Sequence, residues 1–447
     1  MKIVIYSSNS NLYKVEDFYI EQYAKCKDNF LNCIKKYTSL EIVLVTELPG
    51  MFLLDFYPDG KVEKAKEIQY LILEKSSAEE MAQKIIDLQP DIVIQATFWA
   101  ESFDWLTLND SVIGEILKSN GIKTISHSLL SSMICFNKKR MRDFLFENHF
   151  NAAKSVYVHH ELFRIERSHT EIQKNPYQTA VFNEIKKLNF PVIIKDTFGL
   201  SSYGMDVVST FASAKNILMS KKNSGDRLVE EYIDGIQFGT EIHGKSGQYT
   251  VFPPFMFSVN QYGITSPKQS VKIGPVTDER FCLNDLYSML IKLAEKLELN
   301  GIAQVDLVFN KGKWYVLEVN PRLSGMTELI AKSFESSTQG VLVSLALNQK
   351  PDTSRMRKVL DIKFPIITSE VQKKLYNTEN VLFVRQVHNK KARQHREEGF
   401  CEVILGKTDT FLELKTALKN LYNEFSNIFE EDFYKKACKM LDFLQDF

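Results

Sequence analysis

The stretch that most constrains the fold of this chain is residues 301–322, GIAQVDLVFNKGKWYVLEVNPR, which has the pattern of two β-strands joined by a short turn. Apolar and polar residues alternate through the first half, as they do in a hairpin with one buried face. A three-residue loop over 311–313, with Gly312 at a positive φ, places Asp306 directly opposite Glu318. Opposed side chains in an antiparallel pair lie roughly 5 Å apart at Cβ. The hairpin therefore predicts two closely spaced carboxylates.

This pair of carboxylates predicts a metal site, because the two charges repel unless a cation lies between them. Alternation puts Val316 and Asn320 on the same side of the second strand as Glu318, so the Asn320 oxygen adds a third ligand. Mg²⁺ is typically held by one or two carboxylates together with substrate phosphates. Arg322, just past the strand, supplies a fixed positive charge beside the metal. The alternative is a solvated hairpin face whose charges meet only water.

Composition sets limits on class and partners. With 447 residues and 44% hydrophobic residues, the chain is expected to form two or three domains. Its 56 acidic and 56 basic residues balance, which gives no reason to expect a nucleic-acid or anionic-membrane partner. The basic run 390–396 is interpreted as a solvated turn. Six scattered cysteines without a C-x-x-C pair are typical of reduced thiols in a cytoplasmic protein. No apolar run is long enough to span a membrane.

The fold class predicted is mixed α/β and α+β, in three parts. Residues 1–128 alternate strand and helix signals and are expected to form an open α/β sheet. Ser77 and Glu80 form a capping box at the start of one helix. The dinucleotide fingerprint G-x-G-x-x-G is absent from this region. Residues 129–349 carry the candidate site motifs, and residues 350–447 are expected to form a small α+β domain.

A second candidate site lies in PVIIKDTFGLSSYGM, residues 191–205. Lys195 ends a buried run, where an ammonium group is costly without an anion. The loop that follows can bring backbone N–H groups to phosphate oxygens through Gly199, Ser201, Ser202 and Gly204. The strand LVEEYIDG, residues 228–235, can offer its backbone to an adenine edge, with Glu230 accepting from the amine. The alternative for the loop in residues 191–205 is a simple turn, and the alternative for residues 228–235 is an ordinary strand without a ligand.

Taken in order, these motifs resemble the ATP-grasp superfamily. The matching motifs are Asn137-Lys138 at the start of a helix, PVIIK with its Gly/Ser loop, EEYI at 230–233, Gly239-Thr240-Glu241, and Asp306…Glu318-x-Asn320-Pro321-Arg322. The resemblance is strongest over residues 130–345 and implies a central ATP-grasp domain. The order of the motifs along the chain and the spacing from Asp306 to Glu318 are specific to this superfamily, whereas each motif alone is not.

The resemblance implies a role for each matching residue. Lys138 and Lys195 would contact ATP phosphates under the 199–204 loop, with Lys139 as the fallback for Lys138 because Asn137 replaces the usual Asp. Adenine would be held by the strand Glu230, Glu231, Tyr232 and Ile233. Mg²⁺, or Mn²⁺ in its place, would be bound by Asp306, Glu318 and Asn320. Arg322 and Lys195 would be catalytic, with Arg322 stabilising an acyl phosphate.

The function implied is an ATP- and Mg²⁺-dependent carboxylate–amine ligase that forms an amide and releases ADP and phosphate. One of the substrates is expected to be an amino acid. The expected partners of the protein are a small-molecule carboxylate and an amine, and a homodimer is left open. The segment after Arg322 lacks the Glu-His pair of biotin carboxylases. A bicarbonate-activating carboxylase or carbamoyl-phosphate-type synthetase is therefore the second hypothesis, and a non-catalytic nucleotide-binding protein the third.

Two further features are candidate contributors to the site. His243 follows Glu241 by two residues on the same strand face, and packing or solvent contact is its alternative. The aromatic run 252–257, with Tyr262, is a candidate lining for an apolar substrate side chain. Core packing is the default for such aromatic residues.

Overall fold

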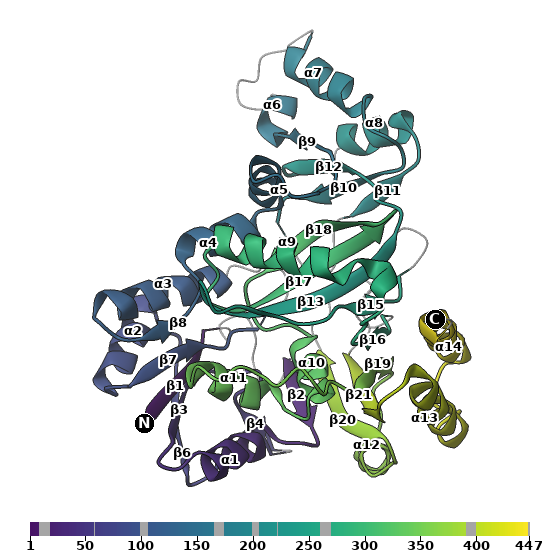
Figure 1. Cartoon of the computed structure of the whole chain (residues 1–447). Coiled ribbons are helices and arrows are strands. Elements are labelled where there is room, and N and C mark those ends of the chain that lie inside the picture. Colours follow the sequence, from purple (N-terminus) through teal and green to yellow (C-terminus); the bar gives the residue numbers. More distant parts are fainter. Residues whose placement is uncertain are drawn as a thin grey trace.

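A computed structural model describes residues 1–8, 18–57, 59–98, 106–164, 174–198, 205–220, 222–259, 270–389 and 399–445. It has the mixed α/β architecture predicted from the sequence, with three main sheets and helices on their faces (Figure 1). None of the described helices is both long and apolar enough to cross a membrane.

The N-terminal part is a five-stranded parallel sheet, which confirms the predicted open α/β layer. Its order is β6 (Ile68–Leu73), β3 (Glu41–Glu47), β1 (Lys2–Ser7), β7 (Ile92–Gln95) and β8 (Thr124–Ile125). The helices α2 (Ala78–Asp87) and α3 (Leu106–Ser119) cover one face. The other face packs against α1 (Cys26–Lys36) and α11 (Thr338–Ala346). The predicted capping box of Ser77 and Glu80 is present at the start of α2.

A four-stranded antiparallel sheet forms the upper lobe in Figure 1. Its order is β11 (Asp206–Val208), β10 (Val192–Asp196), β12 (Arg227–Glu231) and β9 (Ser155–Val158). The apolar side chains of one face, among them Val192, Ile194 and Val229, pack against α6 (His160–Arg164), α7 (Pro176–Ile185) and α8 (Phe211–Met219). The opposite face carries Lys195 and Glu230, because alternate residues of a strand point to opposite faces.

The largest sheet has ten strands and carries the predicted hairpin. Its order is β18 (Lys313–Asn320), β17 (Gly301–Asn310), β13 (Ile236–Gly244), β15 (Phe255–Phe257), β16 (Lys272–Gly274), β19 (Lys358–Phe364), β21 (Gly399–Thr408), β20 (Val381–Asn389) and β2 (Phe18–Gln22), with β14 (Thr250–Val251) beside β13. Hydrogen bonding from β16 to β19 carries this sheet across the boundary predicted at 349/350.

Both faces of the ten-stranded sheet are covered. The main apolar core lies under α5 (Lys138–Glu147), α9 (Leu283–Lys296), α13 (Phe411–Glu424) and α14 (Glu431–Gln445). The short α10 (Thr327–Ser333) packs on the other face through Leu329 and Ile330. The remaining elements are α4 (Leu129–Phe136), α12 (Ser369–Tyr376), the short helix η2 (Glu279–Phe281), and the strand pair β4 (Asp55–Phe56) and β5 (Val62–Glu63).

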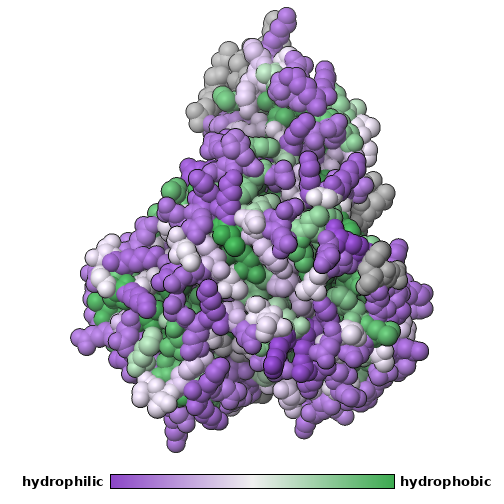
Figure 2. All heavy atoms as spheres, in the orientation of Figure 1, coloured by the Kyte–Doolittle hydropathy of each residue, from purple (hydrophilic) through white to green (hydrophobic). Residues whose placement is uncertain are grey.

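The surface shown in Figure 2 is largely hydrophilic, with hydrophobic patches interrupting it. The most exposed large hydrophobic side chains of the described residues are Leu130 (66%), Leu412 (64%) and Leu162 (53%). They lie on α4, α13 and α6, three helices in different parts of the chain. These three helices lie apart in Figure 1 and do not form one contact surface, and the homodimer stays a prediction.

Candidate active site

The β17–β18 hairpin pairs Asp306 with Glu318 as predicted, but it does so by a different turn. Lys311 (φ 48°) and Gly312 (φ 75°) form a two-residue turn between Asn310 and Lys313, so the predicted three-residue loop is wrong. The register then shifts by one residue between Asp306 and Leu307. Because of this irregularity, a β-bulge, Asp306 faces Glu318 just as it would after a three-residue loop without a bulge.

The bulge also changes which residues share a face. Val316 and Val319 are both fully buried in the main apolar core, although strict alternation would separate them. The prediction that Val316 shares a side with Glu318 is therefore wrong, because the extra residue at the bulge interrupts the two-residue period. Asn320 follows Val319 by one position and so lies on the face opposite the core, beside Glu318.

A hydrogen-bonded row of polar side chains connects the two strands. Asn320 Nδ2 donates to Gln304 Oε1 (2.9 Å), and Gln304 Nε2 donates to Asp306 Oδ1 (2.5 Å). Arg322 Nη2 donates to Asn320 Oδ1 (3.1 Å). Gln304 was not predicted as a site residue; its place two positions before Asp306, on the same strand face, was the available signal. The row fixes the orientation of three of the four predicted residues at this end of the hairpin.

The Asp306–Glu318 pair is suited to a divalent cation. Burial, followed by repulsion from Glu318, raises the pKa of Asp306 to about 7, and Gln304 and Arg322 oppose this shift only in part. A divalent cation between the carboxylates would relieve both costs, and the oxygen ligands present are the type that Mg²⁺ prefers. Among the described residues there is no cluster of three or more His, Cys, Asp or Glu side chains that could hold a metal. Substrate phosphates would have to complete the coordination.

A second charged cluster faces this hairpin from the four-stranded sheet. The ammonium of Lys195 pairs with Glu230 Oε2, and Arg142 Nε donates to Glu230 Oε1 (2.7 Å). All three side chains are buried. Burial lowers the pKa of Lys195, although the Glu230 charge opposes the shift. Burial raises the pKa of Glu230, but the charges of Arg142 and Lys195 outweigh it and hold that pKa below its ordinary value.

Arg142 joins the two clusters. Its Nη1 donates to the carbonyl of Val316 (3.2 Å) and its Nη2 to that of Leu317 (3.4 Å). These two residues of β18 lie at the bulge, directly before Glu318. Sequence reasoning missed Arg142 as a site residue. The available signal was its place four residues after Lys138, which puts both residues on one side of α5.

The remaining predicted nucleotide residues lie around this cluster. Asn137 caps α5 by accepting from the N–H groups of Lys139 (2.9 Å) and Arg140 (3.1 Å), so it serves as the N-cap that an Asp would provide. Lys138 N donates to the carbonyl of Thr197 (2.9 Å), which ties the helix start to the end of β10. The fallback Lys139 pairs instead with Asp143 along the helix.

On β12, the carboxylate of Glu231 accepts from Asn189 through its backbone N–H (2.9 Å) and its amide (3.0 Å). Tyr232 N donates to the Pro191 carbonyl (3.0 Å), and Ile233 is partly buried. The phosphate loop residues Gly199, Ser201, Ser202 and Gly204 lie outside the described residues, as do Tyr262 and the basic run 390–396.

The segment after Arg322 is anchored by a fully buried carboxylate. Glu241 Oε1 accepts from Ser324 Oγ (2.8 Å) and Thr327 Oγ1 (2.6 Å), and its Oε2 contacts His243 Nε2 (2.8 Å). Glu241 lies across from Gln304 in the sheet, so this anchor is on the same face as the metal row. His243 therefore supports the anchor rather than the reacting groups directly.

The aromatic run predicted to line a pocket is divided between the core and the site. Phe252 and Phe255 are fully buried and pack against α10, so core packing explains them. Phe257 is only partly buried, and its ring lies where a side chain on Gly239 would be, beside the Asp306 row.

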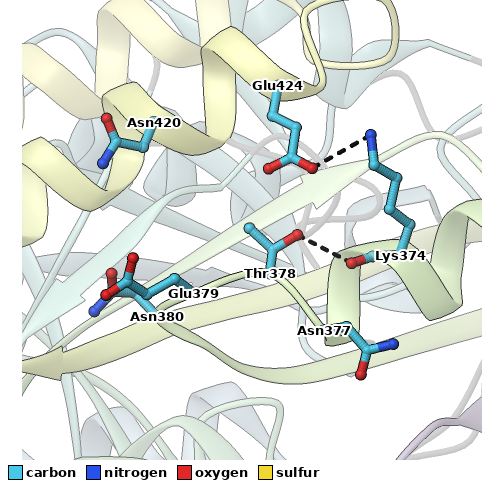
Figure 3. Close-up of a pocket in the computed structure, with 7 residues that line it drawn as sticks. All are labelled: Lys374, Asn377, Thr378, Glu379, Asn380, Asn420 and Glu424. Atoms are coloured by element: carbon cyan, nitrogen blue, oxygen red, sulfur yellow. Dashed lines mark hydrogen bonds and ion pairs between the residues drawn. The ribbon is translucent and has the colours of Figure 1, made fainter.

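A pocket on the C-terminal part is separate from these clusters (Figure 3). It is lined by Lys374, Asn377, Thr378, Glu379, Asn380, Asn420 and Glu424. Lys374 is paired with Glu424 (3.3 Å), and none of the predicted site residues reaches it. Within this pocket the charges of Lys374 and Glu424 therefore balance each other.

Comparison with known proteins agrees with this geometry. Residues 165–326, which include β10, β12 and the hairpin, match the sequence model of the ATP-grasp domain. The chain contains an ATP-grasp domain. Its curated relatives include the carbamoyl phosphate synthase large chain of Clostridium acetobutylicum, 21% identical over 268 residues, which covers 58% of this chain and 24% of that protein. The C-terminal section of the same enzyme from Aquifex aeolicus is 22% identical, with 50% and 44% covered. The chain thus spans less than half the length of these relatives.

Several solved structures align over nearly the whole chain. An L-amino acid ligase from Bacillus licheniformis superposes with a TM-score of 0.64 at 14% identity, covering 96% of this chain and 98% of that one. N5-carboxyaminoimidazole ribonucleotide synthetase from Thermotoga maritima gives 0.59 at 14% identity, covering 94% and 97%. The biotin carboxylase domain of a Hydrogenobacter thermophilus 2-oxoglutarate carboxylase, in complex with MgADP and bicarbonate, gives 0.59 at 11%, covering 100% and 98%. At these identities the likeness establishes the fold of the ATP-grasp domain and its flanking parts.

Proposed function

We propose that this protein is an ATP- and Mg²⁺-dependent carboxylate–amine ligase that forms an amide bond through an acyl phosphate, with an amino acid as one substrate. The observation that carries the proposal is the link between two charged clusters. Arg142 connects the buried Lys195–Glu230 pair to the backbone of β18 at Val316 and Leu317, directly before Glu318 of the Asp306–Glu318 pair. One cluster offers carboxylates to a cation and the other offers cations to phosphates, as phosphoryl transfer from ATP requires.

The proposed reaction has two steps. A carboxylate oxygen of the acid bonds to the γ-phosphorus of ATP while the bond from that phosphorus to the β,γ-bridging oxygen breaks, giving an acyl phosphate and ADP. The amine nitrogen then attacks the carbonyl carbon, loses a proton, and phosphate leaves. An acyl phosphate hydrolyses readily, so water must be excluded from the site between these steps.

The predicted site residues that the structure describes have physical roles in this scheme. Lys195 and Lys138 neutralise phosphate charge, and Asp306, Glu318 and Asn320 hold Mg²⁺, which when bound neutralises charge on the transferred phosphoryl group. Arg322 faces the charge that develops on the carbonyl oxygen. The hydrogen bond from Arg322 to Asn320 keeps that positive charge next to the metal ligands. Glu230 and the backbone of Tyr232 and Ile233 would contact adenine.

Bicarbonate activation is the second candidate function, because the curated relatives are carbamoyl phosphate synthases. The local structure favours the ligase. The acidic residue that follows Arg322 most closely is Glu328, and its carboxylate is already bound by Thr338 N (2.8 Å), Thr338 Oγ1 (2.6 Å) and Lys332. Burial raises the pKa of Glu328, but the Lys332 charge and the Thr338 hydrogen bonds outweigh it and hold that pKa below its ordinary value, which makes this carboxylate a weak base toward bicarbonate.

The test is ATP turnover by purified protein with Mg²⁺ and pooled amino acids, compared with bicarbonate alone. The proposal expects ADP and phosphate only when amino acids are present, together with a new amide mass. Turnover with bicarbonate alone would instead support the carboxylase function, and ATP binding without any turnover would support a non-catalytic protein. Glu318→Ala serves as the matched inactive control.

A further inference from the structure

Beyond the metal row, the same face of the ten-stranded sheet carries a buried ladder of charges. Lys272 on β16 is followed across three neighbouring strands by Asp361, Lys363, Glu402 and Arg385. Lys363 Nζ lies 2.8 Å from Asp361 and 2.8 Å from Glu402, and Arg385 pairs with Glu402. The side chains of these last four residues are at most 5% exposed.

Within this ladder the cations outnumber the carboxylates by three to two. Asp361 uses both of its oxygens on Lys363 (3.0 and 2.8 Å), and Glu402 is shared by Lys363 and Arg385. Lys272 is left with the longest contact, 3.2 Å to Asp361 Oδ2. Asp306 also lies within electrostatic range of Lys272, but the proposed cation would use that carboxylate. Because a buried cation with incomplete anionic partners is costly, the ladder favours an additional anion at its Lys272 end.

Lys272 lies beside the candidate active site. Its ammonium is 5.9 Å from the centre of the Phe257 ring, which occupies the space over Gly239 next to the Asp306 row. A side chain on Gly325, three residues after Arg322, would come within 3.7 Å of the same ammonium. The side chain of Lys272 is 12% exposed, the most accessible of the ladder. An acid held at Arg322 can therefore extend over Phe257 toward Lys272.

We infer that the acid substrate is a dicarboxylic acid, with its reacting carboxylate at Arg322 and its second carboxylate bound by Lys272. This inference rests on the proposed ligase function and names the substrate class of that site. The apolar Phe257 ring forms the floor for the carbons between the two carboxylates. Asp361 holds the ammonium in place, and Lys363 prevents Asp361 from cancelling the Lys272 charge completely.

The experiment compares acids that differ only in the second charge: glutamate against glutamine, and aspartate against asparagine. Phosphate release is measured with saturating ATP, Mg²⁺ and a pooled amine for the unmodified protein and for Lys272→Met. We expect the dicarboxylic acids to have the lower KM in the unmodified protein. Lys272→Met is expected to raise that KM about 10- to 100-fold, the range for a hydrogen bond between charged groups, while the KM of the amides stays within about twofold. Lys272→Arg, which keeps the charge, is expected to retain most of the preference.

Lys358→Met is the matched control, because within the described part of the chain the Lys358 ammonium donates to neutral groups, the Pro275 carbonyl (2.9 Å) and Thr277 Oγ1 (3.4 Å). It should leave the preference unchanged. Lys272→Met should also fold, because Asp361 keeps its contacts to Lys363. Turnover confined to singly charged acids, or equal losses for acids and amides in Lys272→Met, would overturn this inference alone. No turnover with any acid would contradict the proposed function itself.

Discussion

Arg142→Met tests whether the two charged clusters form one unit. In the folded protein the Arg142 guanidinium binds Glu230 (2.7 Å) and the carbonyls of Val316 (3.2 Å) and Leu317 (3.4 Å). Breaking a buried ion pair by removing one partner typically costs about 3–5 kcal/mol. Lys195 still pairs with Glu230 in the variant, which points to the lower end of that range. We therefore expect the free energy of unfolding to fall by about 3 kcal/mol.

The assay is thermal unfolding of the variant and of the unmodified protein. A loss of about 3 kcal/mol corresponds to a fall in Tm of about 6–12 °C for a cooperative unit of about 150–250 residues. Arg140→Met is the control, because Arg140 is an exposed residue of the same helix. Its effect is expected to stay within about 0.5 kcal/mol.

The pH dependence of this effect has a defined sign. Arg142 and Lys195 hold the pKa of Glu230 below its ordinary value despite burial, so this stabilisation is present above the unfolded-state pKa and is lost as pH falls through the folded-state pKa. The difference between the unmodified protein and Arg142→Met should therefore be largest near neutral pH and shrink on acidification. A Tm within about 2 °C of the unmodified protein at pH 7 would refute the reasoning that Arg142 joins the clusters.

Three further predictions concern single sites. Glu318→Ala or Asp306→Ala is expected to abolish turnover with little loss of secondary structure by circular dichroism; unchanged activity would remove the metal assignment. Lys195→Ala should raise the apparent KM for ATP and lower kcat, and near-normal kinetics would make this lysine purely structural. Asp110 has a pKa raised to about 7 by burial, so the folded state keeps a proton that the unfolded chain releases, and stability should fall as pH rises from about 4 to about 7. Asp110→Asn should therefore have a higher Tm than the unmodified protein at pH 8 and a similar Tm at pH 4, whereas a lower Tm at pH 8 would contradict this.

The hairpin shows which features of the site could be predicted from the sequence and which could not. The facing of Asp306 and Glu318 could be predicted because their spacing is fixed by a short turn. The loop length was wrong because a two-residue turn with a β-bulge gives the same pairing as a three-residue turn without one. Arg142, whose guanidinium donates to the carbonyls at the bulge, is more than 170 residues away in the chain (|i−j| = 174 to Val316), and such a contact leaves no local pattern.

The Lys272 ladder could not be predicted for a similar reason. Its five residues come from four strands, and Lys272 on β16 is separated by more than 80 residues from the other three strands (|i−j| = 89 to Asp361). The continuity of the sheet from β16 to β19 brings them together, whereas the sequence predicted a separate C-terminal domain starting at residue 350. The three-part division of the chain stays a prediction.

Transfer of labelled oxygen from the acid to phosphate tests the central claim most directly. The protein is incubated with ATP, Mg²⁺ and amino acids whose carboxylates carry heavy oxygen, and the products are analysed by mass spectrometry. An acyl phosphate mechanism predicts ADP, an amide, and inorganic phosphate that contains one heavy oxygen atom from the acid. Heavy oxygen in AMP, with release of pyrophosphate, would contradict the account, because it would show that the acid attacks the α-phosphorus instead.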